Sequence, residues 1–574
     1  MQLRPSFRDG NPGPMNYFSR PVPTSRLVLL CAAVVLYLGV VHFLRNRQSV
    51  ALVGLLMQYA MVLPCLLWVL KGWRGSSAAP LSVPRAAGVL MTAYIALTVP
   101  LARHEADWPS HVVDETCYSF QAHIFRAGRA VAEPLPGATE SIQTTPDEIN
   151  YQNHVMLARG WFTHFPPGWP ALLVLGQALG VPWILNPLLG LVLLDVTLLI
   201  CREVFSEGAA QLSVLMAVLS PFFLVNAAVA LSHMFCAVLV AGACWLTLRG
   251  LDRKQIVSIA GAFLLLGVAI QVRPYTAFAE TLVLGCAALW YSRKDGKFAA
   301  EVALAGAVSG LAAGLCMVAY NHATTGHFLV TPYAARVGAE IPSELTFDPR
   351  MIFHYLHHWG GITFKQTLFS TFPFLFLLGG YALAKEKDKR RETIILAWTF
   401  AILPLAYLLH TENSYSYFGS RFHFEGLFAA FLLAARGIEL LAETWALPRR
   451  GALAVLGLLA VMQVADVKGM VESLWHVGGQ YHAIKAAVAR WNGQVPLVFI
   501  RDGDAYHARF ANFNHADWRI APTLYLIDAD PQKRDEWACR VGRADWVVLS
   551  VGAGTQLHQE KGHSTCPVAS ETRH

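Results

Sequence analysis

The sequence predicts an all-α polytopic membrane protein with a small C-terminal α/β domain. Hydrophobic residues make up 55% of the 574 residues and charged residues only 14%, and the mean hydropathy is +0.41. A soluble domain needs far fewer apolar residues to fill its core. Apolar runs recur from Leu27 to about Ala465, so many helices are expected to cross the bilayer instead of a single anchor.

Thirteen apolar runs are predicted to cross the membrane as helices. They lie at residues 27–44, 50–70, 86–102, 182–201, 209–226, 232–248, 255–272, 274–291, 298–320, 367–384, 392–410, 423–441 and 451–465. The run GWPALLVLGQALG at 168–180 is too short to span the membrane and begins among three prolines. We therefore expect it to lie at the outward-facing surface of that membrane.

Basic residues gather in alternate loops, as in the run KEKDKRRE at 385–392. Because cytoplasmic loops carry an excess of Lys and Arg, we expect the tail 1–26 to be cytoplasmic and two additional helices to follow within 27–85. The membrane region 86–465 then carries two long outer loops, 103–167 and 321–366. The net charge of +7 arises in these clusters, so nucleic acid is not an expected partner.

Residues 466–574 alternate between helix and strand patterns and are expected to form an extracytoplasmic α/β domain. We predict a helix at 471–491, strands at 495–500, 523–527 and 546–551, and a helix that begins with Asp530 as N-cap and Pro531 in its first turn. Cys539 and Cys566 lie in this region, and an oxidising outer compartment permits a disulfide between them.

The stretch HVVDETCYSF at 111–120 places Asp114 and Glu115 side by side in the first outer loop, at the start of a predicted helix. The apolar positions of this helix are expected to form a membrane-facing stripe: Tyr118, Phe120, Ile124 and Phe125. A carboxylate at the bilayer surface can take a proton from a hydroxyl group. The alternative is an ordinary pair of solvated charges.

The order of the motifs resembles the GT-C superfamily. An Asp–Glu pair in the first outer loop, then PPGWPALLVLGQALG at 166–180, then a span that ends in an Arg–x–x–Phe turn, is similar to bacterial protein mannosyltransferases and the aminoarabinose transferase, a glycosyltransferase family 39-like pattern. The resemblance covers residues 86 to 441. It implies an inverting glycosyltransferase of the bacterial cytoplasmic membrane that moves a sugar from a polyprenyl-phosphate donor to an acceptor hydroxyl at the outer face.

The resemblance also implies roles for the acidic pair. Asp114 is the expected general base, and Glu115 is expected to support acceptor or metal binding. Where many relatives have an aspartate at the outer end of a later span, this chain has Ser232 and His233 in ALSHMFCA. His233 is therefore a candidate for binding the donor phosphate, or a divalent cation such as Mg²⁺ or Mn²⁺ together with Asp114 and Glu115, and metal dependence stays open.

The leaving group of such a donor is a lipid phosphate, which calls for cations at the outer surface. Arg273 in QVRPYTAF lies between two predicted spans, and Arg421 in YFGSRFHFE follows a glycine-bearing loop. A guanidinium can hold phosphate oxygens with two bonds at once. The alternative is that both side chains only extend to the membrane interface.

Three further residues are candidates for binding the acceptor, which is expected to be a glycan, a lipid or a protein. Asp147 and Glu148 form a second acidic pair in TTPDEINYQN, where a polar loop role is the alternative. Tyr333 ends NHATTGHFLVTPY, which resembles family segments over the donor site.

Two other functions remain open on the sequence. A transporter or flippase of a polyprenyl lipid also has many spans, although such proteins usually show internal repeats and interrupted helices that face each other, and neither is clear in this sequence. A cell-envelope polysaccharide polymerase or ligase would use the same lipid donor. Release of free polyprenyl phosphate separates transfer from transport.

Overall fold

The computed structural model describes residues 83–107, 113–338, 375–407, 415–416, 419–445, 483–502, 507–510, 512–551 and 557–566. The predicted spans at 27–44, 50–70 and 451–465 and the tail 1–26 lie outside these residues, as does most of the second outer loop.

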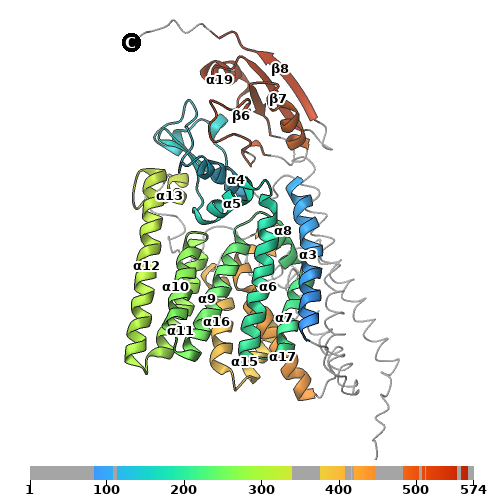
Figure 1. Cartoon of the computed structure of the whole chain (residues 1–574). Helices are drawn as coiled ribbons and strands as arrows, with labels where there is room; N and C mark the ends of the chain where they lie inside the picture. Colours follow the sequence, from blue (N-terminus) through green and yellow to red (C-terminus); the bar gives the residue numbers. More distant parts are fainter. Residues whose placement is uncertain are drawn as a thin grey trace, which may run out of the picture.

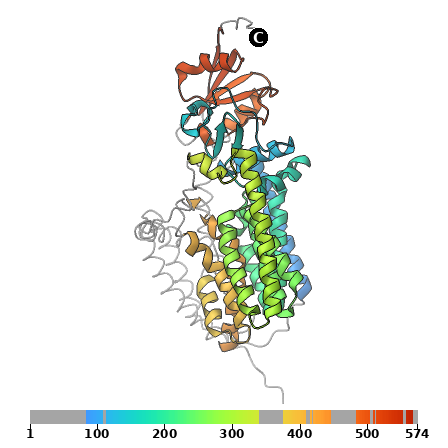
Figure 2. The same ribbon diagram turned by 90° about the vertical axis from the view of Figure 1, so that its left-hand side faces the viewer.

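The membrane region is a bundle of helices that run side by side (Figures 1 and 2). It contains α3 (Val83–Asp107), α6 (Leu185–Val204), α7 (Glu207–Leu219), α8 (Pro221–Ala228), α9 (His233–Arg253), α10 (Ile256–Ile270), α11 (Pro274–Ser292), α12 (Gly296–Thr325), α15 (Leu375–Lys385), α16 (Arg390–Tyr407) and α17 (Leu427–Trp445). Each coincides with a predicted span. Among the described helices, three are long and apolar enough to cross a membrane, or four if one bent pair counts as a single span. The total of thirteen stays a prediction.

The bent pair is α7 and α8, which together occupy the predicted span 209–226 and meet at 68°. Ser220 breaks the helix because its side chain accepts a hydrogen bond from the backbone N–H of Phe223, at 3.3 Å, and so caps α8. Pro221 has no N–H to continue the α7 hydrogen bonds, and it occupies the first turn of α8.

One end of the bundle carries the first outer loop (Figure 1), with α4 (Val113–Arg126) and the hairpin of β1 (His154–Leu157) and β2 (Gly160–Thr163). Two more short helices lie at the same end: α5 (Gly168–Ala178) and α13 (Pro332–Val337), which belongs to the second outer loop. We call this the loop end, and the opposite end, where Lys254 and Lys385 lie, the basic end. Helix α5 has 11 residues and packs beside α4, and the surface position expected for 168–180 stays a prediction.

The apolar side of α4 does not face the membrane, so this prediction was wrong. Phe120 and Ile124 are 2% and 0% exposed, and the ring of Phe120 lies 4.6 Å from that of Trp161 on β2. Tyr118 points toward the bundle, where its hydroxyl lies 3.1 Å from Ser232 Oγ. An amphipathic pattern does not show whether its apolar side packs against lipid or protein. Here it packs against protein, namely β2 and the helix bundle.

The C-terminal region forms a four-stranded sheet in the order β6-β5-β7-β8, at the loop end (Figures 1 and 2). Strand β5 (Leu497–Ile500) is parallel to β6 (Leu524–Ile527) and to β7 (Asp545–Val551), and β8 (Leu557–His563) is antiparallel to β7. The first three strands were predicted. Strand β8, LHQEKGH, was missed because it is a mostly exposed edge strand without apolar alternation.

The helical parts of this region also follow the sequence. Residues 483–491 are helical, within the predicted helix 471–491. Asp530 accepts a hydrogen bond from Gln532 N, and the turn η8 (Pro531–Lys533) leads into α19 (Arg534–Arg540). A disulfide joins Cys539 on α19 to Cys566 after β8, which confirms the predicted pairing.

The first outer loop and the C-terminal sheet share one hydrophobic core. Tyr151 donates a hydrogen bond of 2.7 Å to the carbonyl of Tyr525 on β6, and Trp518 donates one of 3.1 Å to the carbonyl of Pro134. The sheet therefore holds the first outer loop, including α4, against the end of the bundle.

Candidate functional site

Asp114 occupies the first turn of α4, where a helix favours an acidic residue, and it is 9% exposed. Its Oδ2 lies 3.1 Å from Nη2 of Arg421, at the start of the turn η6 (Arg421–Gly426). Its Oδ1 accepts a hydrogen bond of 3.2 Å from Nδ2 of Asn153. Asn153 has a φ of 58°, a left-handed conformation that asparagine tolerates better than most residues. Both carboxylate oxygens thus have partners from other segments. Glu115, next to Asp114, is half-buried.

Glu425 binds two of the residues that were predicted to hold the donor phosphate. It is 0% exposed, and its Oε1 lies 2.8 Å from Nδ1 of His233 and 2.8 Å from Nε of Arg273. Arg273 also donates a hydrogen bond of 3.3 Å to the hydroxyl of Tyr407. Glu425 is not among the site residues predicted from the sequence. The signal for it is an acidic residue at the edge of an apolar span, which is rare without a functional or pairing reason.

The ring of Phe422 joins the two arginines. Cζ of Arg273 lies 5.1 Å from the ring centroid and Cζ of Arg421 lies 5.4 Å from it. The ring of His233 stacks on Phe422 at 6.1 Å. We call Arg273, Arg421, His233, Phe422 and Glu425 the arginine cluster. The structure thus brings together the three candidates for phosphate binding, although they come from distant parts of the sequence.

A cavity of about 330 Å³ is lined in part by Asn153, whose Nδ2 donates to Asp114. It is lined by Gln152, Asn153, His164, Tyr333, Arg336, Val337 and Arg509. The ring of Tyr333 packs 4.5 Å from that of His164. Small-molecule sites usually start at about this size, roughly 300 Å³. The cavity therefore has room for part of a substrate next to Asp114.

Asp147 and Glu148 lie where the first outer loop meets the C-terminal sheet. Oδ1 of Asp147 accepts a hydrogen bond of 2.7 Å from Nη2 of Arg509. Glu148 is 2% exposed, and its Oε1 lies 3.8 Å from Nζ of Lys533. Neither acidic residue lines the cavity, but Arg509 does, so Asp147 is one side chain away from it.

A metal site does not follow from this geometry. Among the residues that the structure describes, no three His, Cys, Asp or Glu side chains gather as ligands. Asp114 contacts Arg421 and Asn153, whereas His233 contacts Glu425. The set Asp114, Glu115 and His233 therefore does not fit one divalent cation, and we derive no step through a metal.

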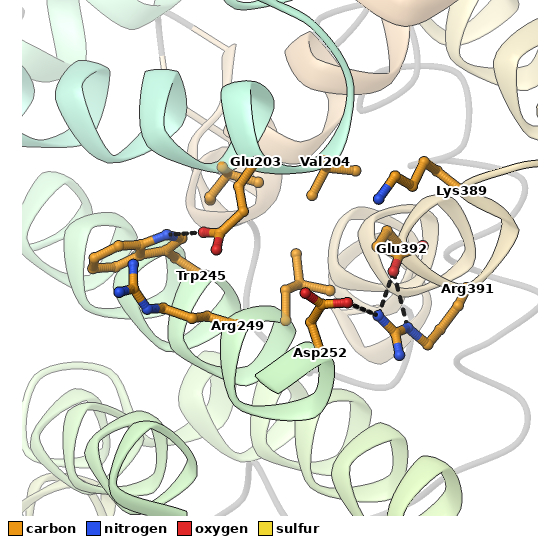
Figure 3. A pocket seen from close by; sticks show the side chains of 10 residues that line it. Glu203, Val204, Trp245, Arg249, Asp252, Lys389, Arg391 and Glu392 are labelled. Atoms are coloured by element: carbon orange, nitrogen blue, oxygen red, sulfur yellow. Dashed lines mark hydrogen bonds and ion pairs between the residues drawn. The ribbon is translucent and has the colours of Figure 1, made fainter. Parts of the chain in front are cut away.

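A second pocket lies at the basic end, between α6, α9 and α16 (Figure 3). Its charged side chains contact one another: Arg391 lies 3.6 Å from Asp252 and 2.5 Å from Glu392, and Trp245 donates to Glu203 at 2.9 Å. Its volume of about 30 Å³ is close to the space that one water molecule occupies. This pocket is too small for a sugar, so the candidate site is at the loop end.

No protein-family model and no curated protein sequence matches this chain. Its fold, however, is similar to solved structures. The oligosaccharyltransferase of Archaeoglobus fulgidus in its apo form matches with a TM-score of 0.51 and 10% identity, over 81% of this chain and 69% of that chain. ArnT from Cupriavidus metallidurans bound to undecaprenyl phosphate matches with a TM-score of 0.50 and 16% identity, over 81% of this chain and 93% of that chain. The chain therefore has the fold of the GT-C membrane glycosyltransferases, which confirms the fold that the motifs implied.

Proposed function

We propose that this protein is an inverting glycosyltransferase that moves a sugar from a polyprenyl-phosphate donor to an acceptor hydroxyl, at the outer face of a bacterial cytoplasmic membrane. One observation carries the proposal. Asp114 contacts Arg421 of the arginine cluster with one carboxylate oxygen and Asn153 of the cavity wall with the other. A carboxylate in this position faces both a site for an anionic leaving group and a site for the acceptor.

The arginine cluster is proposed to bind the donor phosphate. Nε and Nη1 of Arg421 are buried and make no hydrogen bond to any described residue, so this guanidinium has donors left for phosphate oxygens. Arg273 and His233 are fixed by Glu425, which holds their positions around Phe422. ArnT, whose fold is similar, was solved with undecaprenyl phosphate bound, and this supports a polyprenyl phosphate as the leaving group.

Asp114 is proposed to act as the general base. It takes the proton of the acceptor hydroxyl while the hydroxyl oxygen attacks the anomeric carbon and the bond to the phosphate oxygen breaks. Attack on the face opposite the phosphate inverts the anomeric configuration, and free polyprenyl phosphate is the second product. Before the donor binds, Arg421 compensates the charge of Asp114. A bound phosphate competes for that guanidinium and leaves the carboxylate oxygen available to the acceptor.

The cavity is proposed to bind the acceptor, with Tyr333 packing against it. Asp147 and Glu148 are proposed to act on the acceptor only through Arg509 and Lys533, the partners that they contact. Glu115, in the same turn as Asp114, is proposed as a secondary residue on the acceptor side.

The test is to incubate the purified full-length protein, in lipid nanodiscs, with a panel of polyprenyl-phosphate sugars and a bacterial envelope extract. We expect one donor to be consumed, with release of free polyprenyl phosphate and transfer of a single labelled sugar. A flippase would move the donor across vesicles without releasing the phosphate, and a polymerase or ligase would transfer a block of several sugars. Either result would replace the proposed function.

A further inference from the structure

The cavity beside Asp114 is positively charged. Its described lining includes two guanidinium groups, Arg336 from α13 and Arg509 from the C-terminal sheet region, and no carboxylate. The third basic side chain, His164, adds no charge near neutral pH, because burial and the nearby charge of Arg336 hold its pKa well below the usual range.

Of the two guanidiniums, Arg336 has less negative charge near it among the described residues. It is half-buried and makes no hydrogen bond or ion pair with any residue in the described ranges. The short helix that carries it is fixed at both ends: Thr331 Oγ1 accepts from Ala334 N at 3.1 Å, and Gly338 ends the helix with a φ of 67°. The caps fix the backbone that places Arg336 at the cavity wall, and no acidic residue among those described holds its side chain there.

Arg509 already has one partner, because its Nη2 donates to Asp147. Among the described residues, Arg336 is then the one guanidinium of the cavity wall without an acidic partner. Burial and the like charge of Arg509 lower the pKa of Arg336. Two positive side chains in the wall of one cavity repel each other, and an anion that binds between them removes this repulsion.

We propose that the acceptor is anionic, and that a phosphate or carboxylate group on it binds between Arg336 and Arg509 while one of its hydroxyls reaches Asp114. This inference rests on the proposed glycosyl transfer. Planar guanidiniums suit both anions, since each presents two parallel N–H donors. The C-terminal sheet region is then part of the acceptor site, because it supplies Arg509.

The test combines binding and turnover on the full-length protein. Binding of glycerol 3-phosphate, of glucuronate and of uncharged glycerol is measured by calorimetry, and the two anions separate a phosphate site from a carboxylate site. Turnover is measured as release of polyprenyl phosphate, with the envelope extract divided by anion exchange into anionic and neutral fractions. The variants are Arg336→Gln and Arg336→Lys, and Arg519→Gln is a matched control that removes an exposed arginine of the same C-terminal region.

We expect at least one anion to bind and glycerol not to bind, and only the anionic fraction to support turnover. Arg336→Gln should weaken anion binding and raise the KM for the anionic fraction, each by roughly 10- to 100-fold, which is the effect expected for a lost hydrogen bond to a charged group. Arg336→Lys should lose less, and Arg519→Gln nothing. The affinity for the donor should not change in any variant.

Two results would overturn the inference and leave the proposed function standing: turnover with the neutral fraction, or normal anion binding and KM in Arg336→Gln. A drop in donor affinity in Arg336→Gln would also overturn it, because the cavity would then bind the donor phosphate. If the wild-type protein releases no polyprenyl phosphate with any fraction, the proposed function fails, whatever the anions bind.

Discussion

The guanidinium of Arg421 lies 3.1 Å from the carboxylate of Asp114, which links the proposed phosphate site directly to the proposed base. The two residues are more than 300 positions apart in the sequence and reach each other from α4 and η6. Because a bound phosphate would compete with Asp114 for the guanidinium of Arg421, donor binding and base function should be coupled in this site. Because of this coupling, variants of Asp114 and of Arg421 should affect kcat and KM in different ways.

Asp114→Asn is expected to abolish most turnover and to preserve donor binding. The change keeps the shape and the hydrogen bond to Asn153 but removes the basic site, and a lost general base costs about 10² to 10⁴ in kcat. Glu115→Gln, in the same helical turn, is the matched control and should cost less, mainly in KM. Wild-type turnover in a folded, donor-binding Asp114→Asn protein would show that Asp114 is not the general base.

Lysine variants of the two arginines should weaken donor use in different ways. Both changes keep the charge but remove the planar fork that holds two phosphate oxygens. Arg273→Lys also disturbs the contact with Glu425, so it should raise the KM for the donor and lower the thermal stability. Arg421→Lys should raise the KM for the donor and in addition lower kcat, since Arg421 contacts the base. Unchanged kinetics in both variants would mean that neither arginine binds the donor phosphate.

The charged residues of the site were largely predictable, but their contacts were not. Asp114, Arg273, Arg421 and His233 stand out because charged residues are rare in so apolar a chain. The sequence does not show that they gather around Phe422, because His233 and Glu425 are 192 positions apart and only the packing of α9 against η6 brings them together. The sequence did not point to Arg336 or Arg509, because arginines are common in outer loops and do not stand out there.

Glu425 should matter more for the stability of the arginine cluster than for turnover itself. Glu425→Gln leaves an acceptor for His233 but removes the charge that opposes Arg273, and unpairing a buried ion costs about 3–5 kcal/mol. We expect a clear fall in the midpoint of thermal unfolding. The double variant Glu425→Gln with Arg273→Gln should recover part of it, because no buried charge is then left unpaired. Strictly additive losses would show that the two residues act independently.

Asp147 is expected to hold the first outer loop to the C-terminal region and to compete with the acceptor for Arg509. Asp147→Asn should therefore not weaken binding of glycerol 3-phosphate, and a gain of a few-fold is expected because Nη2 of Arg509 loses its anionic partner. The exposed ion pair contributes little stability, about 0–1 kcal/mol. If Asp147 instead bound the acceptor itself, the same variant would raise the KM for the acceptor and leave the anion affinity unchanged.

His154 should make the attachment of the first outer loop sensitive to acid. Its side chain is buried; Nδ1 lies 2.9 Å from the carbonyl of Gln152, and Nε2 lies 3.1 Å from Nδ2 of Asn512 in the C-terminal region. Burial lowers the pKa of His154 to about 4, from an ordinary 6.5. In this neutral form Nδ1–H donates to the carbonyl and Nε2 accepts from Asn512, an arrangement that a protonated ring cannot keep.

The direction in which stability changes with pH follows from the lowered pKa of His154. The unfolded chain takes up the proton near pH 6.5 and the folded chain only near pH 4, so the stabilising contribution is complete above pH 6.5 and is lost as the pH falls from 6.5 toward 4. Between pH 7 and pH 5 the loss is about 2 kcal/mol. His154→Gln keeps a side-chain acceptor and donor without the titration, so its midpoint of thermal unfolding should fall less than that of the wild type over this range. Equal falls in both proteins would mean that other groups set the acid sensitivity and that folding does not lower the pKa of His154.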